Sequence, residues 1–292
     1  MTEQKRSLSD FKRRETIFIN LPSGGHLYPP GSLVPAPSGE IGVKPMTAAD
    51  QITLSNPEAL ISGDATVKII QSCVSGVLYP ETLLAPDVEA IYAGIRLATY
   101  GETTELELHC PKCNHYHAFD MPIRYSLDNM TTLPEDPKAT INVNGGDGAQ
   151  ELDIYVRPYT LVESTQDANI KFQQTKAAQL LFKDDDNLEN PDLNSEFFKS
   201  IQNIASETVK LVSQCIIKIV DHETGAEFDL SDKSLILDWI NNLPAKEAEK
   251  ITSLVGELNS KYGIKKEIDV VCESCKHEWK SEINFDPTSF FG

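Results

Sequence analysis

The sequence predicts an α+β fold in which two internally duplicated units of helices and a β-hairpin are joined by a zinc-ribbon-like site of four cysteines, behind an extended N-terminal arm. A Tyr-Gly pair, an alternating apolar run, a Cys-x-x-Cys motif and a histidine occupy 100–115 and again 262–277. Each landmark of the second cassette lies 162 residues after its counterpart. This constant offset indicates duplication, and two such motifs between strand-like runs are what a four-cysteine zinc site requires.

Composition limits the function of the chain. Its 292 residues are 40% hydrophobic, which is sufficient for a packed core. The formal net charge of −18, from 44 acidic and 26 basic residues, opposes a phosphate backbone, so we expect no nucleic-acid partner. No run approaches the roughly 18 apolar residues that span a bilayer, and the N-terminus lacks the apolar core of a signal peptide. We therefore expect a globular protein of the cytosol with no membrane partner.

Residues 1–42 differ from the rest of the chain because prolines and glycines recur through them. Such a stretch cannot bury a core of its own. We predict an extended N-terminal arm, which either stays loose or becomes ordered against a neighbouring surface.

The duplication extends upstream of the cassettes. Val43–Thr47 and Val156–Thr160 share a strand end, a proline and a threonine placed as a helix N-cap. These landmarks divide the remaining chain into copy one at 43–125 with the first zinc knuckle, a connecting β-hairpin at 126–155, and copy two at 156–292 with the second knuckle.

Each copy is also predicted to carry a helix with a cysteine in its apolar face. Val67–Val74 and Val209–Ile216 read as such helices, and their Cys73 and Cys215 are expected to act as small buried hydrophobic residues. These thiols are therefore predicted to belong to the core.

A later helix in each copy follows a proline and stops at the Tyr-Gly pair. We predict these helices at Asp87–Thr99 and Ala245–Lys261, each ended by a glycine in the left-handed conformation. In the connecting hairpin, Thr140–Val143 and Leu152–Val156 are predicted as the strands.

Four cysteines supply the soft ligands that zinc prefers in a tetrahedron, namely Cys110, Cys113, Cys272 and Cys275. A closed set of four sulfurs leaves no position for water. We therefore predict one structural Zn²⁺ that holds the hairpin of one copy against that of the other.

The histidines near the motifs allow a second interpretation. His115 and His277 lie two residues after each motif, where zinc ribbons usually keep a histidine outside the ligand set. The alternative is two separate sites, in which His117 or His109 completes the first and His277 the second. One shared site explains both copies with fewer ligands.

Catalytic patterns are missing from the sequence. Thioredoxin-like Cys-x-x-Cys motifs begin a helix, whereas these motifs lie between strand-like runs. The sequence contains no His-Glu-x-x-His, no Gly-x-Ser-x-Gly and no deaminase signature. We therefore predict that the protein is not an enzyme.

Several segments in order suggest a family. The arm segment Leu21–Gly24, the turn Val43–Thr47, the helix Ile91–Gly101 and the motif Cys110–Cys113 resemble the baseplate hub assembly proteins of T-even-like contractile-tailed bacteriophages. The resemblance covers roughly Leu21–Ile123.

This resemblance implies a late, non-enzymatic structural protein. Such a protein is made in the host cytoplasm, binds other phage baseplate and tail proteins, and helps to build or becomes part of the virion tail baseplate. Two alternatives from other classes are a cellular zinc-ribbon adaptor that binds protein partners and a metal-dependent enzyme.

Overall fold

The computed structural model describes residues 12–143, 150–182 and 191–283, except for the side chains of 176–201. Its backbone contacts divide the chain into two compact units. The first unit comprises Met1–Pro80, Pro86–Thr132 and Gly263–Gly292, and the second comprises Glu81–Ala85 and Leu133–Tyr262. Both predicted zinc knuckles therefore belong to the first unit.

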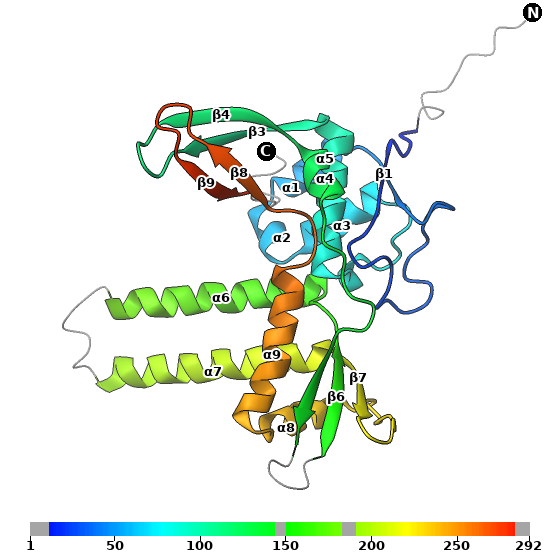
Figure 1. Cartoon of the computed structure of the whole chain (residues 1–292), viewed down its shortest axis with the longest axis vertical. Coiled ribbons are helices and arrows are strands. Elements are labelled where there is room, and N and C mark those ends of the chain that lie inside the picture. Colours follow the sequence, from blue (N-terminus) through cyan, green and yellow to red (C-terminus); the bar gives the residue numbers. More distant parts are fainter. Residues whose placement is uncertain (1–11, 144–149, 183–190, 284–292) are drawn as a thin grey trace, which may run out of the picture. The chain divides into compact units, whose positions relative to one another are not determined.

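The first unit combines short helices with two-stranded antiparallel sheets (Figure 1). Its helices are α1 (Ala48–Leu54), α2 (Pro57–Ile61), α3 (Asp64–Cys73), α4 (Ala85–Tyr100) and α5 (Ile123–Asp128). Its strand pairs are β1 (Ile17–Ile19) with β2 (Ile41–Val43), β3 (Thr103–His109) with β4 (Tyr116–Pro122), and β8 (Glu267–Val271) with β9 (Glu278–Glu282). Helix α4 packs closely on the first pair at Gly94, where a Cβ would lie 3.1 Å from Ile19 Cδ1.

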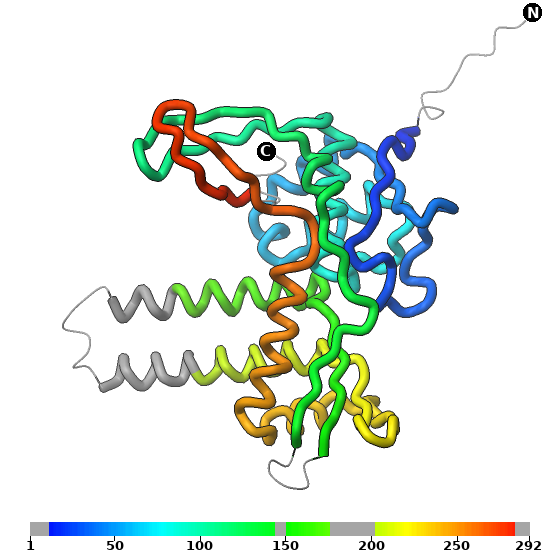
Figure 2. The backbone as a smooth tube through the Cα atoms, in the orientation of Figure 1, coloured from blue at the N-terminus to red at the C-terminus, as the bar shows by residue number. Residues whose placement is uncertain are grey.

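The second unit is built on one antiparallel sheet. Its strands, in sheet order, are β5 (Lys138–Asn142), β6 (Glu151–Val156) and β7 (Ile216–Asp221). Its helices are α6 (Leu161–Phe182), α7 (Pro191–Cys215), α8 (Lys233–Asn241) and α9 (Ala245–Ser260). Helices α6 and α7 contact each other, and the coloured parts of the tube in Figure 2 show them running side by side. In the core, the side chains of Ile154, Ile216 and Ile251 are fully buried.

Helices and small antiparallel sheets together confirm the predicted α+β class. The predicted late helices are also confirmed as α4 and α9, and they are followed by left-handed glycines, Gly101 with φ 96° and Gly263 with φ 115°. The strands predicted for the connecting hairpin are β5 and β6, and the glycine-rich loop between them lies outside the described residues. Within the described part of the chain, every helix is too short or too polar to cross a membrane.

The predicted helices around the core cysteines are right except at their last residue. Cys73 ends α3 and Cys215 ends α7, and both side chains are fully buried as predicted. Val74 is extended because it pairs with Val43, and Ile216 is extended because it begins β7. An apolar residue at a helix end continues the helical pattern in the sequence, so periodicity alone does not mark this boundary.

The small sheets of the two units follow the same chain order. In each, a hairpin is followed by helices and then by an antiparallel segment, giving β1–β2–Val74 in the first unit and β5–β6–β7 in the second. The N–H of Lys44 donates to the carbonyl of Cys73 at 2.8 Å, and that of Arg157 donates to the carbonyl of Cys215 at 3.0 Å. The end of the core-cysteine helix is thus fixed to the same strand position in both units.

In the first unit an arginine joins the start of one helix to the end of another. We call this arrangement an arginine clamp: a guanidinium that donates hydrogen bonds to a proline carbonyl, to the acid of a capping box and to the carbonyl before the core cysteine. Arg13 donates to Pro45 O at 2.6 Å, to Asp50 Oδ2 at 3.1 Å and to Ser72 O at 2.6 Å. Asp50 also forms a capping box with Thr47, which confirms the predicted N-cap.

The second unit contains a matching clamp. Arg157 donates to Pro158 O at 2.9 Å, to both carboxylate oxygens of Glu163 at 2.6 and 2.9 Å, and to Gln214 O at 3.1 Å. Thr160 and Glu163 exchange hydrogen bonds of 2.8 and 3.3 Å at the start of α6, as an N-cap and its acid do. Both clamps therefore join a capping box to the end of a core-cysteine helix.

The described part of the predicted arm packs against the first unit. Ile19 and Leu21 are buried, and the following turn is held by the Asp87 carboxylate on α4. This carboxylate accepts from the N–H of Ser23 at 2.9 Å and from the Tyr28 hydroxyl at 2.7 Å. Burial raises the pKa of Asp87, although its three hydrogen bonds from Ser23 and Tyr28 act in the opposite direction.

Candidate metal centre

Two knuckle turns carry the Cys-x-x-Cys motifs, one between β3 and β4 and the other between β8 and β9. In the first, the N–H of Cys110 donates to His115 O at 2.9 Å and the N–H of Asn114 donates back to Cys110 O at 2.8 Å. In the second, the N–H groups of Cys272 and Lys276 donate in the same pattern, at 2.8 and 2.9 Å. The residue after each motif is left-handed, with φ 56° at Asn114 and 58° at Lys276. The two knuckles therefore have the same backbone shape.

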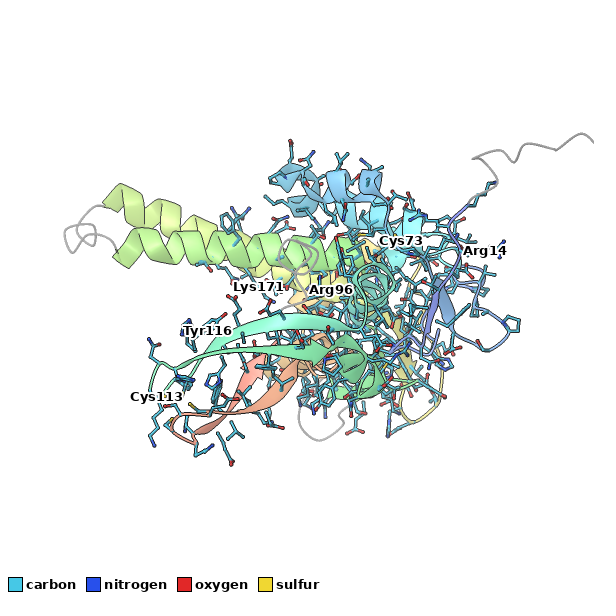
Figure 3. The ribbon with its side chains drawn as sticks, turned by 90° about the horizontal axis from the view of Figure 1, so that it is seen from above. Arg14, Cys73, Arg96, Cys113, Tyr116 and Lys171 are labelled. Carbon is cyan, nitrogen blue, oxygen red and sulfur yellow. The ribbon has the colours of Figure 1, made fainter. Side chains whose placement is uncertain are left out.

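The knuckles lie side by side and bring the four cysteines together (Figures 1 and 3). The Sγ atoms of Cys110 and Cys275 are 3.7 Å apart, those of Cys113 and Cys272 are 3.6 Å apart, and all four lie within 4.8 Å of one another. Cys110 and Cys272 are buried, Cys275 is partly exposed, and Cys113 is exposed at the end of its hairpin. The shortest sulfur distances are far beyond the roughly 2.05 Å of a disulfide bond.

The donor set fits a tetrahedral thiophilic cation. A Zn–S bond of about 2.3 Å corresponds to sulfur atoms about 3.8 Å apart at the corners of a tetrahedron. The two short distances, 3.6 and 3.7 Å, match that spacing. Four thiolates this close repel one another, so a cation is needed for all of them to ionise. The arrangement is therefore compatible with a metal site.

The thiols differ in their tendency to ionise. Burial opposes ionisation of Cys272, but the N–H of Cys275 and the side chain of His117 outweigh it and lower the pKa of Cys272 to about 5. The N–H of His115 favours the thiolate of Cys113, but the neighbouring thiols raise its pKa to about 12. Cys272 thus ionises readily whereas Cys113 stays protonated, so that binding of a metal to all four sulfurs would release protons.

The histidines lie beside the sulfur cluster. Among the described residues the cluster contains cysteines alone. Both short sulfur pairs join one knuckle to the other, whereas two separate sites would pair the sulfurs within each knuckle. The ring of His117 lies 5.7 Å from that of Trp279, and the ring of His277 stacks on the same indole at 6.2 Å. Sequence reasoning missed Trp279, although its alternating place on β9 was a signal that it faces inward.

The comparison with protein families gives a match over nearly the whole chain. A family described as T4 bacteriophage base plate protein matches residues 14–292. The chain belongs to this family. No curated protein and no solved structure matches it. The base plate family match confirms the resemblance to T-even-like baseplate proteins, which rested on Leu21–Ile123, and it extends through both knuckles.

Membership of the base plate family is consistent with a structural role for the chain. The four cysteines add a local feature that fits such a role, because a closed set of four thiolates around a metal offers no coordination position to a substrate.

Proposed function

We propose that the chain is a non-enzymatic structural or assembly component of the hub region of a phage tail baseplate. It is a late protein that binds other baseplate and tail proteins in the host cytoplasm and is carried into the virion tail. The observation that supports this most strongly is the base plate family match over residues 14–292. The same match favours a baseplate role over a cellular zinc-ribbon adaptor.

Co-expression with candidate tail proteins, followed by size-exclusion chromatography, tests this function. We expect stable co-elution with baseplate components and none with unrelated acidic proteins of similar size. A chain that elutes alone in the presence of every baseplate component contradicts the proposal.

The proposed metal is one structural Zn²⁺ bound by Cys110, Cys113, Cys272 and Cys275. Bound zinc would compensate the four thiolate charges and fasten the two knuckles into one body. The support is the sulfur spacing and the two short contacts that cross between the knuckles.

Replacing one ligand tests the shared site. Cys110→Ser and, separately, Cys272→Ser should each abolish zinc binding, from about one ion per chain to none, and increase amide hydrogen exchange in both hairpins together. Ser274→Ala, which changes a motif residue that is not a ligand, should leave zinc content unchanged. If only the mutated hairpin loosens and half of the metal remains, the two-site alternative is correct.

We further propose that the chain is an internal duplication in a zinc-ribbon-like framework. The matching sheets, capping boxes and knuckles support this, because they recur in the same order along the chain. The arginine clamps add support because they join corresponding acids and carbonyls, although Arg13 and Arg157 come from different places in the chain. The predicted segments at 1–42, 43–125, 126–155 and 156–292 follow the order of the repeat along the chain. The two compact units divide the chain differently, because the second knuckle belongs to the first unit.

A further inference from the structure

Strand β4 has an edge without hydrogen-bond partners among the described residues. At the two ends of the β3–β4 ladder, the N–H of Cys110 donates to the carbonyl of His115 and the N–H of Ile123 donates to the carbonyl of Glu102. These two bonds fix which of the residue pairs between them are hydrogen-bonded. Because bonded and non-bonded pairs alternate in an antiparallel ladder, Tyr116, Ala118 and Asp120 direct their N–H and C=O groups away from β3. Within the described residues these backbone groups have no partner.

Strand β8 has a matching free edge. Bonds from Cys272 and Ile283 close the ends of the β8–β9 ladder, so Glu267, Asp269 and Val271 direct their backbone groups away from β9. These groups likewise lack partners in the described part of the chain. All six edge residues on the two strands are exposed.

The two free edges line the same slot, which has a volume of about 320 Å³. Its walls are consecutive residues of each strand, Tyr116 to Phe119 on one side and Asp269 to Val271 with Glu273 on the other. A groove over a sheet face is lined by alternate residues, whereas consecutive residues indicate that the slot runs along the strand edges. Figure 3 shows Tyr116 on this hairpin, near Cys113 at its end.

The slot combines acidic and apolar walls. Asp269 and Glu273 are both acidic, and among the described residues no lysine or arginine lines the slot. Phe119 and Val270 point to the inner, more buried side, whereas Tyr116 and Asp269 point to the exposed side. An extended segment with alternating basic and apolar side chains would match both the charge and the alternation.

We propose that this slot binds an extended, lysine- or arginine-bearing segment of another baseplate protein, which adds a strand to the free edge of β4. The backbone groups of Tyr116 and Ala118 pair with the segment, and Asp269 and Glu273 attract its basic side chains. Strand addition to an exposed edge is a common mode of peptide recognition, and the unpaired edge here is otherwise a liability for aggregation. The proposal rests on the proposed function for the source of the segment.

A synthetic peptide tests the recognition directly. The probe is acetyl-(Lys-Val)₃-amide, and its controls are acetyl-(Glu-Val)₃-amide and an N-methylated lysine peptide that cannot donate backbone hydrogen bonds. The zinc-loaded full chain should bind the first probe at least tenfold more tightly than either control, and binding should slow amide exchange at Tyr116 and Ala118. Equal binding of the lysine and glutamate peptides, or protection elsewhere, overturns the proposal.

Two variants separate the edge from the charge. Ala118→Pro removes one outward N–H without touching the β3–β4 ladder, and Asp269→Lys reverses a charge of the slot; each should weaken binding of the lysine peptide about tenfold. Ala118→Ser and Glu278→Lys, the second lying on β9 outside the slot, are the controls and should bind as the unchanged chain does. If Ala118→Pro fails to fold, the N-methylated peptide still tests the backbone pairing and Asp269→Lys still tests the charge of the slot.

The outcome can be distinguished from a failure of the proposed function. If the Ala118→Pro/Asp269→Lys chain folds and keeps every tail partner, the slot is not the docking site and the baseplate role stands. If the unchanged chain has no tail partner but binds the lysine peptide through the slot, the baseplate role fails. A dimer of the chain that Ala118→Pro dissolves would make a second copy the occupant and overturn the choice of partner.

Discussion

The two arginine clamps perform the same bonding with arginines that come from different places in the chain. Arg157 directly follows the last residue of β6 and lies six residues before its carboxylate partner Glu163. Arg13 reaches its partner Asp50 from the N-terminal segment, 37 residues away, while Lys44 occupies the position that corresponds to Arg157. In both units the acid of a capping box lies beside the end of a buried helix and pairs with an arginine. That arginine is a near neighbour in the sequence in the second unit and a distant one in the first.

The difference lies in how far each acid depends on its arginine. Burial opposes ionisation of Glu163, and the hydrogen bonds and charge of Arg157 are the largest effects that lower its pKa. Burial likewise opposes ionisation of Asp50, but the N–H of Thr47 and hydroxyl groups lower its pKa more than the charge of Arg13 does. Ionised Glu163 therefore depends more on its arginine than ionised Asp50 does, because Arg157 stabilises the carboxylate through a bidentate pair.

The largest expected effect follows from removing the local arginine. Arg157→Ala leaves the Glu163 side chain, 8% exposed, without its bidentate partner and leaves the Gln214 carbonyl without one of its donors. Breaking a buried ion pair in this way should destabilise the second unit by about 3–5 kcal/mol. Denaturant unfolding with hydrogen exchange resolved by unit measures this. Lys210→Ala on an exposed face of α7 is the control, and an equal loss in both variants would contradict the clamp.

Removing the long-range arginine should cost less. Arg13→Ala should destabilise the first unit by about 1–3 kcal/mol, because Asp50 keeps its other donors. It should also increase exchange in β1 and β2, since Arg13 fastens the segment that leads into β1. Arg14→Ala, one residue along, is the matched control and should change stability by less than about 0.5 kcal/mol.

The duplication can be tested on the Arg13→Ala background. Lys44→Arg places a guanidinium at the position that Arg157 occupies in the second unit. If the two regions are copies, it should recover at least half of the lost stability of the first unit, measured by the same unfolding experiment. Lys68→Arg, on the core-cysteine helix, should recover none, and equal recovery by both substitutions would argue against equivalence.

Acid should weaken both clamps, the second unit first. Each acid has a lowered pKa in the folded chain, from 4.5 for Glu163 and from 3.8 for Asp50. The stabilisation is therefore complete above those unfolded values and is lost as the pH falls through the lower folded values. Unfolding measured from pH 6 to 2 should show the second unit losing stability from a higher pH. In Arg157→Ala that loss should shrink, and an unchanged slope would contradict the assignment to Glu163.

Local signals in the sequence were sufficient for the repeated elements. The Cys-x-x-Cys motifs, the prolines and the Tyr-Gly pairs act within a few residues, and they predicted both knuckles, α4 and α9. The Arg13 clamp could not be predicted, because nothing near Arg13 distinguishes it from Lys12 or Arg14 until the chain brings Ser72 to it. The free strand edges depend on ladder register, which a period-two pattern does not fix by itself.

The smallest expected effect concerns the left-handed residue of each knuckle. The two knuckles have the same backbone shape but different residues at this position. Asn114 and Lys276 both adopt the left-handed conformation, which asparagine tolerates well and lysine does not. Lys276→Gly should therefore stabilise the second hairpin by about 1 kcal/mol, whereas Asn114→Gly should change the first by only a few tenths of that. Hydrogen exchange of β8–β9 and β3–β4 in the zinc-loaded chain measures the two gains. If both substitutions stabilise their hairpins equally, the left-handed conformation is equally strained in the two knuckles. A contact of the Lys276 side chain would then offset the additional cost expected for lysine.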